Sequence, residues 1–291
     1  MKLWAKLSET LYRHLAKPYL QTFEENSPEK ILKRSLKVLD ADSIESIKQF
    51  VKSKQTDRGG FADRAGKSDI YYTLFGHFIA DALGMKEAFP AIAKYVEEES
   101  ELIKTGVYLH CSAILSSRLG SNKFPPDYFR KRIRSTINQQ KSSQLAYNAF
   151  LSLMTCYYVR DYTGLYLISR QLETTSNEKS LPCPVMAAVL VMKKSFNKPL
   201  DDLKKELLSL VQDNGGFKAT RTAPVTDLLS TAVALYALKF AGQDLRKIKP
   251  DCLNYIDSLF VEGGFGGNSI DTSPDIEYTF YGLLALGSLA D

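Results

Sequence analysis

Three aspartates stand directly before long apolar segments of the sequence, at Asp69, Asp227 and Asp275. Carboxylates in such positions can do acid–base chemistry or hold a metal ion, provided that the fold brings several of them together. Each is equally suited to a structural role as a helix N-cap, in which a side-chain oxygen accepts a hydrogen bond from a free backbone N–H and contributes about 1 kcal/mol. The choice between these roles depends on the elements that carry the aspartates.

A Gly-Gly-Phe triplet precedes each aspartate, and a polar loop joins the two. The glycines are expected to supply backbone of positive φ where the chain leaves a helix, and the phenylalanine to bury against the neighbouring unit. From Asp69 to Asp227 is 158 residues, which is four steps of roughly 40, and a helical-hairpin repeat has about that length. The three triplets begin at Gly59, Gly215 and Gly263.

Charged, amphipathic segments alternate with segments that are apolar on nearly every side, as expected when surface helices alternate with buried ones. Strand-like alternation is nearly absent. We therefore expect six pairs, each of one outer and one inner helix. The outer helices are expected at 43–52, 86–99, 127–138, 164–173, 200–211 and 247–259. The inner helices are expected at 69–83, 107–119, 143–159, 184–192, 227–240 and 275–289.

The first and last units resemble each other most, because both contain Asp-Ile-x-Tyr-Thr, at 69–73 and 275–279. An open solenoid would need polar caps at its two ends. The likeness favours a closed ring in which the last helix pair packs beside the first. Several helix starts would then gather around one mouth, whose free N–H groups and helix dipoles suit an anion such as a diphosphate.

Composition excludes several classes of protein. With 44% hydrophobic and 24% charged residues, the chain has the make-up of an ordinary globular protein. Its formal charge of +5 is too small and too dispersed to indicate nucleic-acid binding, and the basic run at 130–134 is expected on an outer helix. The four cysteines are scattered, which argues against a disulfide scaffold and predicts a cytoplasmic location.

The N-terminal 40 residues are set apart from the repeats. Charges recur through residues 1–21, so we expect neither a signal peptide nor a spanning helix there. Residues 1–17 and 29–39 are expected to form two helices, joined by a short link that contains proline. The first carries Trp and Leu side chains with basic neighbours, and it would either pack on the outside of the main domain or contact a membrane surface.

The Gly-Gly-Phe and Asp-x-x-Tyr-Thr units resemble the repeats of protein prenyltransferase β subunits and of squalene–hopene and terpene cyclases, over about 43–291. The resemblance implies an all-α (α/α)₆ toroid formed by residues 41–291, with residues 1–40 as a helical extension packed on or beside it. It further implies a central cavity, lined with aromatic side chains, that receives an isoprenoid chain.

The resemblance does not extend to the cyclase acid motif. In the cyclases Asp-x-Asp-Asp-Thr-Ala opens an inner helix, and its middle Asp protonates the substrate. The matching stretch begins at Asp227, but Leu229 stands in place of the proton donor and Ser230 in place of the next acid. A leucine has no proton to donate.

Glu277 is the candidate replacement, because it follows Asp275 by two residues and so holds, in the last unit, the position of the missing acid. A carboxyl that faces an apolar cavity has a raised pKa and stays protonated near neutral pH. The hypothesis is that Glu277, with Asp275 and Asp227, forms the acid cluster of a divergent cyclase or isomerase, and Asp69 is the matching residue of the first unit. The alternative is that Glu277 points outward at a helix N-terminus, where acids are favoured.

The zinc ligands of the prenyltransferases are not retained. Their Asp, Cys and His positions are occupied by Asp227, Leu229 and Tyr278, and catalytic zinc needs three protein ligands and an open position. We therefore expect no cofactor and no zinc-dependent prenyl transfer. If a metal does bind, the residues to consider are His77 or His110 with the aspartates. The helical α subunit of those enzymes would have to come from a separate chain.

Residues on the inner helices are candidates for substrate binding, since aromatic faces stabilise carbocations. Each of them taken singly is also an ordinary core residue, and a buried, hydrogen-bonded histidine is a common one. The candidates are Tyr72, His77, His110, Tyr147, Tyr278, Phe280 and Tyr281.

Two functions from different classes remain. The first is an isoprenoid-processing enzyme that cyclises or isomerises a long apolar substrate by acid catalysis without a metal. The second is a non-catalytic toroid that binds a lipid or a protein partner, or that serves as the β-type subunit of a heteromeric transferase. A toroidal carbohydrate-active enzyme is a third interpretation, but it needs a carboxylate pair and sugar-stacking aromatics, and the single Trp, Trp4, lies outside the ring.

Overall fold

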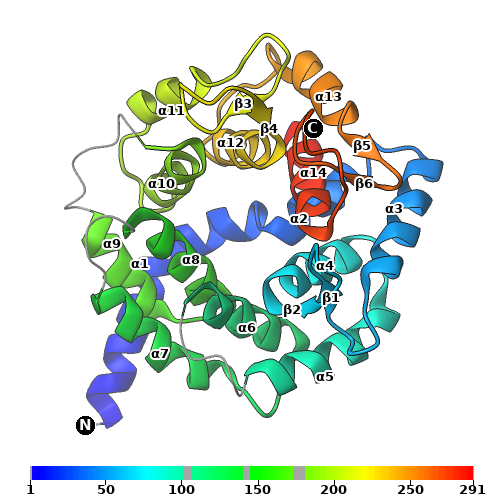
Figure 1. The fold of residues 1–291 in the computed structure, drawn as a ribbon. Helices are drawn as coiled ribbons and strands as arrows, with labels where there is room; N and C mark the ends of the chain where they lie inside the picture. Colours follow the sequence, from blue (N-terminus) through cyan, green and yellow to red (C-terminus); the bar gives the residue numbers. More distant parts are fainter. Residues whose placement is uncertain (1, 101–105, 140–144, 173–180, 291) are drawn as a thin grey trace.

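The computed structural model describes residues 2–100, 106–139, 145–172 and 181–290, and its helices form a ring (Figure 1). The inner helices are α4 (Ile70–Ala82), α6 (Gly106–Leu119), α8 (Leu145–Tyr158), α10 (Cys183–Ser195), α12 (Leu228–Phe240) and α14 (Ile276–Leu289). The outer helices are α3 (Ala41–Lys54), α5 (Phe89–Ser100), α7 (Pro126–Gln139), α9 (Tyr162–Leu172), α11 (Asp201–Leu208) and α13 (Lys249–Asp257). A short 3₁₀ helix, η1 (Lys86–Ala88), leads into α5.

The ring is closed. Each inner helix packs on the next one along the chain, and α14 packs on α4 to complete the circle (Figure 1). The inner helices are buried on most sides, as their all-round apolar sequences predict, whereas the outer helices keep one exposed face. The prediction of six helix pairs in a closed toroid is confirmed.

Each Gly-Gly-Phe turn builds a small antiparallel ladder that the sequence analysis did not foresee. The strands are β1 (Phe61–Ala62) with β2 (Ser68–Asp69), β3 (Phe217–Lys218) with β4 (Thr226–Asp227), and β5 (Phe260–Val261) with β6 (Gly264–Phe265). In all three units the phenylalanine of the triplet lies opposite the aspartate that opens the inner helix, in the pairs Phe61 and Asp69, Phe217 and Asp227, and Phe265 and Asp275.

A threonine four residues after each aspartate ties the turn to the inner helix. In the fifth unit the Thr231 Oγ1 donates to the backbone O of Asp227 at 2.7 Å and accepts from the backbone N–H of Phe217 at 2.8 Å. Thr73 and Thr279 make the same pair of bonds in the first and last units. This hydroxyl clasp satisfies a buried backbone donor that would otherwise lack a partner, and it explains the threonine of the repeat.

The phenylalanine ring of the triplet packs on a small residue one turn further along the inner helix. A Cβ added at Gly76 would lie 2.3 Å from the Phe61 ring, and one added at Gly282 would lie 2.5 Å from the Phe265 ring. These glycines therefore make room for the buried ring. Phe61 and Phe265 are each 1% exposed.

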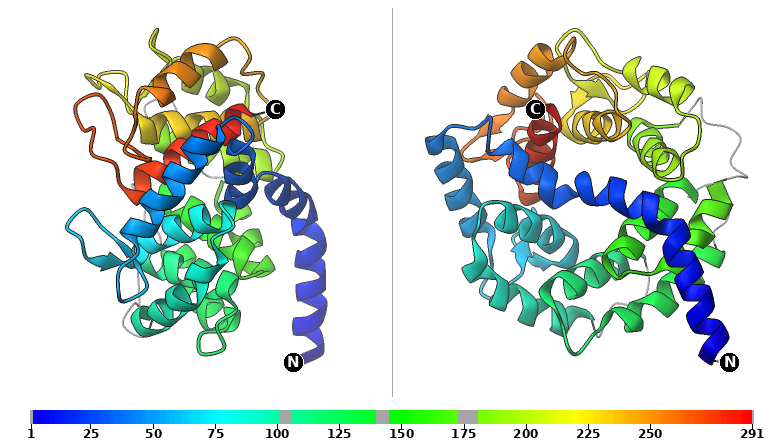
Figure 2. Two further views of the ribbon diagram at one scale, coloured as in Figure 1. Left: turned by 90° about the vertical axis from the view of Figure 1, so that its right-hand side faces the viewer. Right: turned by 180° about the vertical axis from the view of Figure 1, so that it is seen from behind.

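The N-terminal helices cross the face of the ring opposite to the hairpins (Figure 2). They are α1 (Lys2–Glu25) and α2 (Pro28–Ser35); α2 packs on α14 and α4, and α1 packs on α9 and α10. Helix α1 does not end in a link after residue 17 as we expected: it continues through Pro18, because Tyr19 and Phe23 beyond the proline are buried against the ring, at 1% and 0% exposure.

The contact between α2 and α14 is close enough to exclude a side chain. A Cβ added at Gly287 of α14 would lie 1.9 Å from the backbone O of Ile31 in α2. Tyr236 of α12 donates to the backbone O of Asn26 at 2.8 Å, at the junction of α1 and α2. The N-terminal segment is thus an integral part of the packed ring in this structure.

We predict that Thr231→Val is less stable than Thr231→Ser, although valine keeps more buried apolar volume. Valine leaves the Phe217 N–H buried without an acceptor, which costs about 1–3 kcal/mol of unfolding free energy, whereas serine keeps the hydroxyl. Urea unfolding of both variants measures the difference. Equal stability of the two variants, or a more stable valine variant, would contradict the role of the clasp.

Candidate functional site

The three sequence-predicted aspartates cap the inner helices on the hairpin face of the ring. Asp69 accepts from the backbone N–H groups of Tyr71 at 2.8 Å and Tyr72 at 3.1 Å. Asp227 accepts from that of Ser230 and Asp275 from that of Tyr278, both at 2.7 Å. All three aspartates are therefore N-caps. Any acid–base chemistry must use the carboxylate oxygen that does not accept these capping hydrogen bonds.

Asp275 is nearly buried and is paired with an arginine from the first unit. The Arg64 Nε donates to Asp275 at 2.6 Å and its Nη1 donates to Asp271 at 2.8 Å. The guanidinium also lies over the Tyr278 ring, 5.2 Å from its centroid. Arg64 belongs to the loop between β1 and β2, so these contacts bridge the seam where the ring closes.

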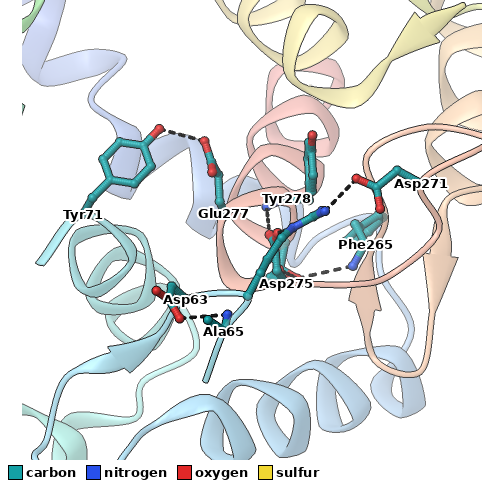
Figure 3. Close-up of polar contacts among 10 residues, drawn as sticks. Asp63, Ala65, Tyr71, Phe265, Asp271, Asp275, Glu277 and Tyr278 are labelled. Atoms are coloured by element: carbon teal, nitrogen blue, oxygen red, sulfur yellow. Dashed lines mark hydrogen bonds and ion pairs between the residues drawn. The ribbon is translucent and has the colours of Figure 1, made fainter. Parts of the chain in front are cut away.

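Glu277 lies on the first turn of α14, and Tyr71 on the first turn of α4 reaches across the seam to it (Figure 3). The Tyr71 hydroxyl donates to the Glu277 Oε1 at 2.7 Å. Burial raises the pKa of the half-buried Glu277, and the hydrogen bond from Tyr71 opposes that rise. The nearby Asp275 and Asp69 raise it further, while Arg64 lowers it. The net result is a pKa above the ordinary value for a glutamate.

We call Arg64, Tyr71, Asp271, Asp275 and Glu277 the seam cluster, because they join the first unit to the last. Asp69 lies near enough to act on Glu277 electrostatically. Asp227 caps the neighbouring helix α12. Burial raises the pKa of Asp227, and the hydrogen bonds from Ser230 oppose that rise. Of the four candidate acids, the described contacts thus bring Asp69, Asp275 and Glu277 together.

A continuous series of aromatic contacts leads from the seam cluster into the ring. Tyr71 contacts Phe75 with ring centroids 4.7 Å apart, and Phe75 contacts Phe280 at 4.8 Å and Tyr281 at 5.7 Å. The series continues from Phe280 to Phe78 at 5.9 Å, and from Phe78 to Tyr158 at 6.0 Å. We call these six residues the aromatic wall.

Other predicted aromatic residues lie around the wall. Tyr72 contacts Tyr71 with centroids 5.9 Å apart, and Tyr278 stacks with Arg64. The side chain of Tyr147 lies outside the described residues. The predicted residues Tyr72, Tyr278, Phe280 and Tyr281 are therefore near the seam cluster or in the wall.

Several inner helices each have one row of side chains that is only half-buried. On α14 it contains Glu277 and Tyr281, and on α12 it contains Leu229 and Val233, in each case four residues apart and therefore on one helix face. The remaining faces of these helices are covered by the outer helices and by neighbouring inner helices. Since these helices also contact their outer and inner neighbours, we infer that the half-buried stripes face the axis of the ring.

The two predicted histidines are buried at other places. His77 Nε2 accepts from Arg118 Nε at 3.1 Å, and burial, aided by the Arg118 charge, lowers the pKa of His77 to about 3. The His110 Nδ1 donates to Thr155 Oγ1 at 2.9 Å, since that hydroxyl donates its own proton to the Leu151 O. Burial lowers the pKa of His110 to about 4. Both are neutral histidines with protein partners.

Arg118 forms a second polar cluster beneath the N-terminal helices, which we call the floor cluster. Its guanidinium donates to Glu29 of α2 at 3.0 Å and to Asp81 of α4 at 3.2 Å. Tyr158 of α8 donates to the other Glu29 oxygen at 2.7 Å. Glu29, Asp81, Arg118, Tyr158 and His77 thus connect α2 to three inner helices.

Sequence reasoning missed Arg64, Tyr71 and Arg118. Arg64 stands in a polar loop and Arg118 near the end of an inner helix, and their partners lie far away in the chain. The one available signal for Arg118 was an isolated charge in an otherwise apolar helix.

The part of the chain that the structure describes contains neither a cluster of metal ligands nor a helix that could span a membrane. Within 2–100, 106–139, 145–172 and 181–290, no group of three or more His, Cys, Asp and Glu side chains is arranged to hold a metal ion. In the same ranges, no helix combines the length and the apolar character needed to cross a membrane.

Comparison with known families agrees with the architecture. The family model described as the prenyltransferase alpha-alpha toroid domain matches residues 30–101 and 154–291. The chain belongs to this family. The two matched stretches of the toroid domain contain the seam cluster and all three aspartate caps, and the first also includes most of α2. A search among curated proteins finds no match to the sequence.

We predict that Glu277→Gln gains stability relative to the native chain as the pH rises. Burial raises the pKa of Glu277 above its ordinary value of 4.5, so ionisation costs more free energy in the folded state than in the unfolded one. That cost is absent at low pH, where both states are protonated, and grows as the pH rises through 4.5 until it is complete above the folded pKa. The amide side chain of the variant does not ionise, so the variant does not incur this free-energy cost at any pH.

Urea unfolding between about pH 4 and pH 8 measures this difference. Glu87→Gln, at an exposed carboxyl on η1, is the control and should show no comparable trend. A stability difference for Glu277→Gln that stays constant over this range would argue against the buried carboxyl described above.

We further predict that Glu29→Gln lowers the free energy of unfolding by about 1–3 kcal/mol, because a charged acceptor shared by Arg118 and Tyr158 is lost. Both side chains of the ion pair are largely shielded, at 16% exposure for Arg118 and 19% for Glu29. A double-mutant cycle with Tyr158→Phe should be non-additive by about 0.5 kcal/mol or more. Strict additivity would mean that the floor cluster does not act as a unit.

Proposed function

We propose that this toroid binds a long apolar isoprenoid chain and cyclises or isomerises it by acid catalysis, with Glu277 as the proton donor. The observation that carries the proposal is the position of Glu277: a half-buried carboxyl with a raised pKa, at the start of a stripe that faces the ring axis and beside the aromatic wall. A raised pKa increases the protonated fraction of a carboxyl at a given pH, and a protonated carboxyl beside an apolar site can deliver its proton to an apolar substrate.

The proposed reaction needs no net supply of protons or electrons. The Glu277 carboxyl transfers its proton to one carbon of an alkene, which forms a C–H bond and leaves a cation on the adjacent carbon. The π electrons of a second alkene close a ring by attacking that cation. Loss of a proton from the resulting cation to a carboxylate forms the product alkene, and return of the proton to Glu277 completes an isomerisation.

Two features support the passage of a cation. Aromatic faces attract positive charge, and the wall supplies Phe75, Phe280 and Tyr281 close to the acid. The axial stripe on α12 is apolar, with Leu229 and Val233, so water that could quench a cation would find few hydrogen-bond partners there. The half-buried stripes also support a central cavity that an apolar chain could enter.

A second candidate is a toroid that binds an apolar ligand or a protein partner without catalysis. The observation in its favour is that each of the four candidate acids already has a structural partner. Asp275 is paired with Arg64, and Glu277 accepts from Tyr71. Asp69 caps α4 and Asp227 caps α12. The β-type subunit of a heteromeric transferase belongs to this class. Membrane contact through residues 1–17 stays a prediction, because the side chains of Leu3, Trp4 and Leu7 lie outside the described residues.

We expect the purified protein to convert a polyunsaturated isoprenoid into isomers of unchanged mass, and in D₂O to add deuterium at carbon. Gas chromatography with mass detection measures both. Glu277→Gln should remove at least about 99% of this conversion, as loss of a general acid costs 10²–10⁴-fold, while Glu87→Gln is the matched control.

The outcomes separate the two candidates. Retention of an isoprenoid without conversion would favour the binding toroid. Conversion that survives in Glu277→Gln would assign the acid to another residue.

A further inference from the structure

The phenol of Tyr71 is held from two sides before it meets Glu277. At the start of α4, Asp69 accepts from the backbone N–H of Tyr71 at 2.8 Å. The Tyr71 ring lies edge-on to Phe75 and Tyr72, with interplanar angles of 84° and 78°, which is a favoured geometry for aromatic pairs. The cap and the two ring contacts therefore fix the direction in which the hydroxyl points (Figure 3).

Glu277 is fixed from its own helix in the same way. It lies on the first turn of α14, where Asp275 accepts from the backbone N–H of Tyr278 at 2.7 Å. The Tyr71 hydroxyl reaches the Glu277 Oε1 at 2.7 Å, a typical length for an O–H···O hydrogen bond. Since both partners stand on capped first turns, their separation is set by the packing of α4 on α14.

The strength of this hydrogen bond depends on the charge of Glu277. A phenol can donate to the carbonyl oxygen of a neutral carboxyl, but a bond to a carboxylate is roughly twice as strong. The proposed reaction begins with a protonated Glu277 and leaves a carboxylate. The bond from Tyr71 therefore strengthens as the proton is transferred, and an interaction that strengthens in this way lowers the barrier.

Tyr71 also makes a larger contribution to the carboxylate form than the neighbouring cation does. Burial is the main cause that raises the pKa of Glu277, and the hydrogen bond from Tyr71 is the main cause that lowers it, ahead of the charge of Arg64. Arg64 is shared with Asp271 and Asp275. The other titratable groups that interact with Glu277 are Asp275 and Tyr278 of α14 and Asp69 and Tyr72 of α4.

We propose that Tyr71 is a positioning residue for the acid: its hydroxyl holds the Oε1 of Glu277 and stabilises the carboxylate that forms while Oε2 delivers the proton. In this step the O–H bond at Oε2 breaks and a C–H bond forms on the substrate, while Tyr71 keeps its own proton. The inference rests on the proposed function. It adds that the strength of the acid depends on ring closure, because acid and partner belong to opposite ends of the repeat.

The test removes the Tyr71 hydroxyl and keeps its ring, as Tyr71→Phe. Carboxyl ¹³C NMR of the full chain, labelled in glutamate and without substrate, measures the titration of Glu277, whose resonance is the one absent from Glu277→Gln. We expect the pKa of Glu277 to rise in Tyr71→Phe, because the hydrogen bond favours the ionised form. Replacement of Tyr71 by 3-fluorotyrosine, a stronger donor of the same shape, should shift the pKa in the opposite direction.

The kinetic measurement uses the isoprenoid conversion described above. Tyr71→Phe should lower kcat by at least about tenfold, since a hydrogen bond to a charged group is lost, with KM changed by no more than about twofold. The alkaline limb of its pH profile should move to higher pH, because the acid keeps its proton longer. Tyr128→Phe, at a half-buried tyrosine of the outer helix α7, is the matched control and should change neither kcat nor the titration.

The outcomes separate this inference from the proposed function. A Glu277 titration that is the same in Tyr71→Phe and in the native chain would overturn the inference, whatever the substrate. A shifted titration with an unchanged kcat would also overturn it, and would leave Glu277 as the acid. Absence of any conversion by the native chain would overturn the proposed function, and the inference with it.

Discussion

The contact between α4 and α14 is the constraint on which the rest of this structure depends. These helices belong to the first and last units of the repeat, and their packing converts a stack of helix pairs into a ring. The same contact brings Tyr71 to Glu277 and Arg64 to Asp275. The surroundings of the candidate acid are therefore assembled by ring closure itself, since Glu277 and Asp275 belong to the last unit whereas Tyr71 and Arg64 belong to the first.

Within each well-preserved unit, one aspartate does two tasks. Its side chain caps the inner helix, while its backbone O accepts from the threonine hydroxyl that binds the phenylalanine of the turn. This arrangement fixes the direction in which the helix leaves the hairpin. It also explains why carboxylates lie at the mouth of an apolar ring whether or not they take part in a reaction, because each of them caps a helix.

The architecture could be predicted from the sequence because its signals are local. Apolar and amphipathic segments of helical length, glycine turns and a repeat of about 40 residues all lie within short stretches, and together they gave the order of helices and the closed ring. Glu277 could be singled out by its offset from Asp275. Its partner Tyr71 could not, because it lies 206 residues away and meets Glu277 only after closure. Arg64 and the contacts of Arg118 were missed for the same reason, and the continuous α1 depends on packing beyond Pro18 that no local pattern expresses.

The approach of Gly287 to the backbone of Ile31 has a consequence for the order of assembly. On the ribosome α2 emerges well before α14, since all the other units of the ring lie between them in the chain. The surface of α2 that α14 covers stays without that partner while the intervening units are made. Completion of the ring is therefore a late event in its synthesis, one that waits for α14 to leave the exit tunnel, and the helices made before it must stay soluble until then.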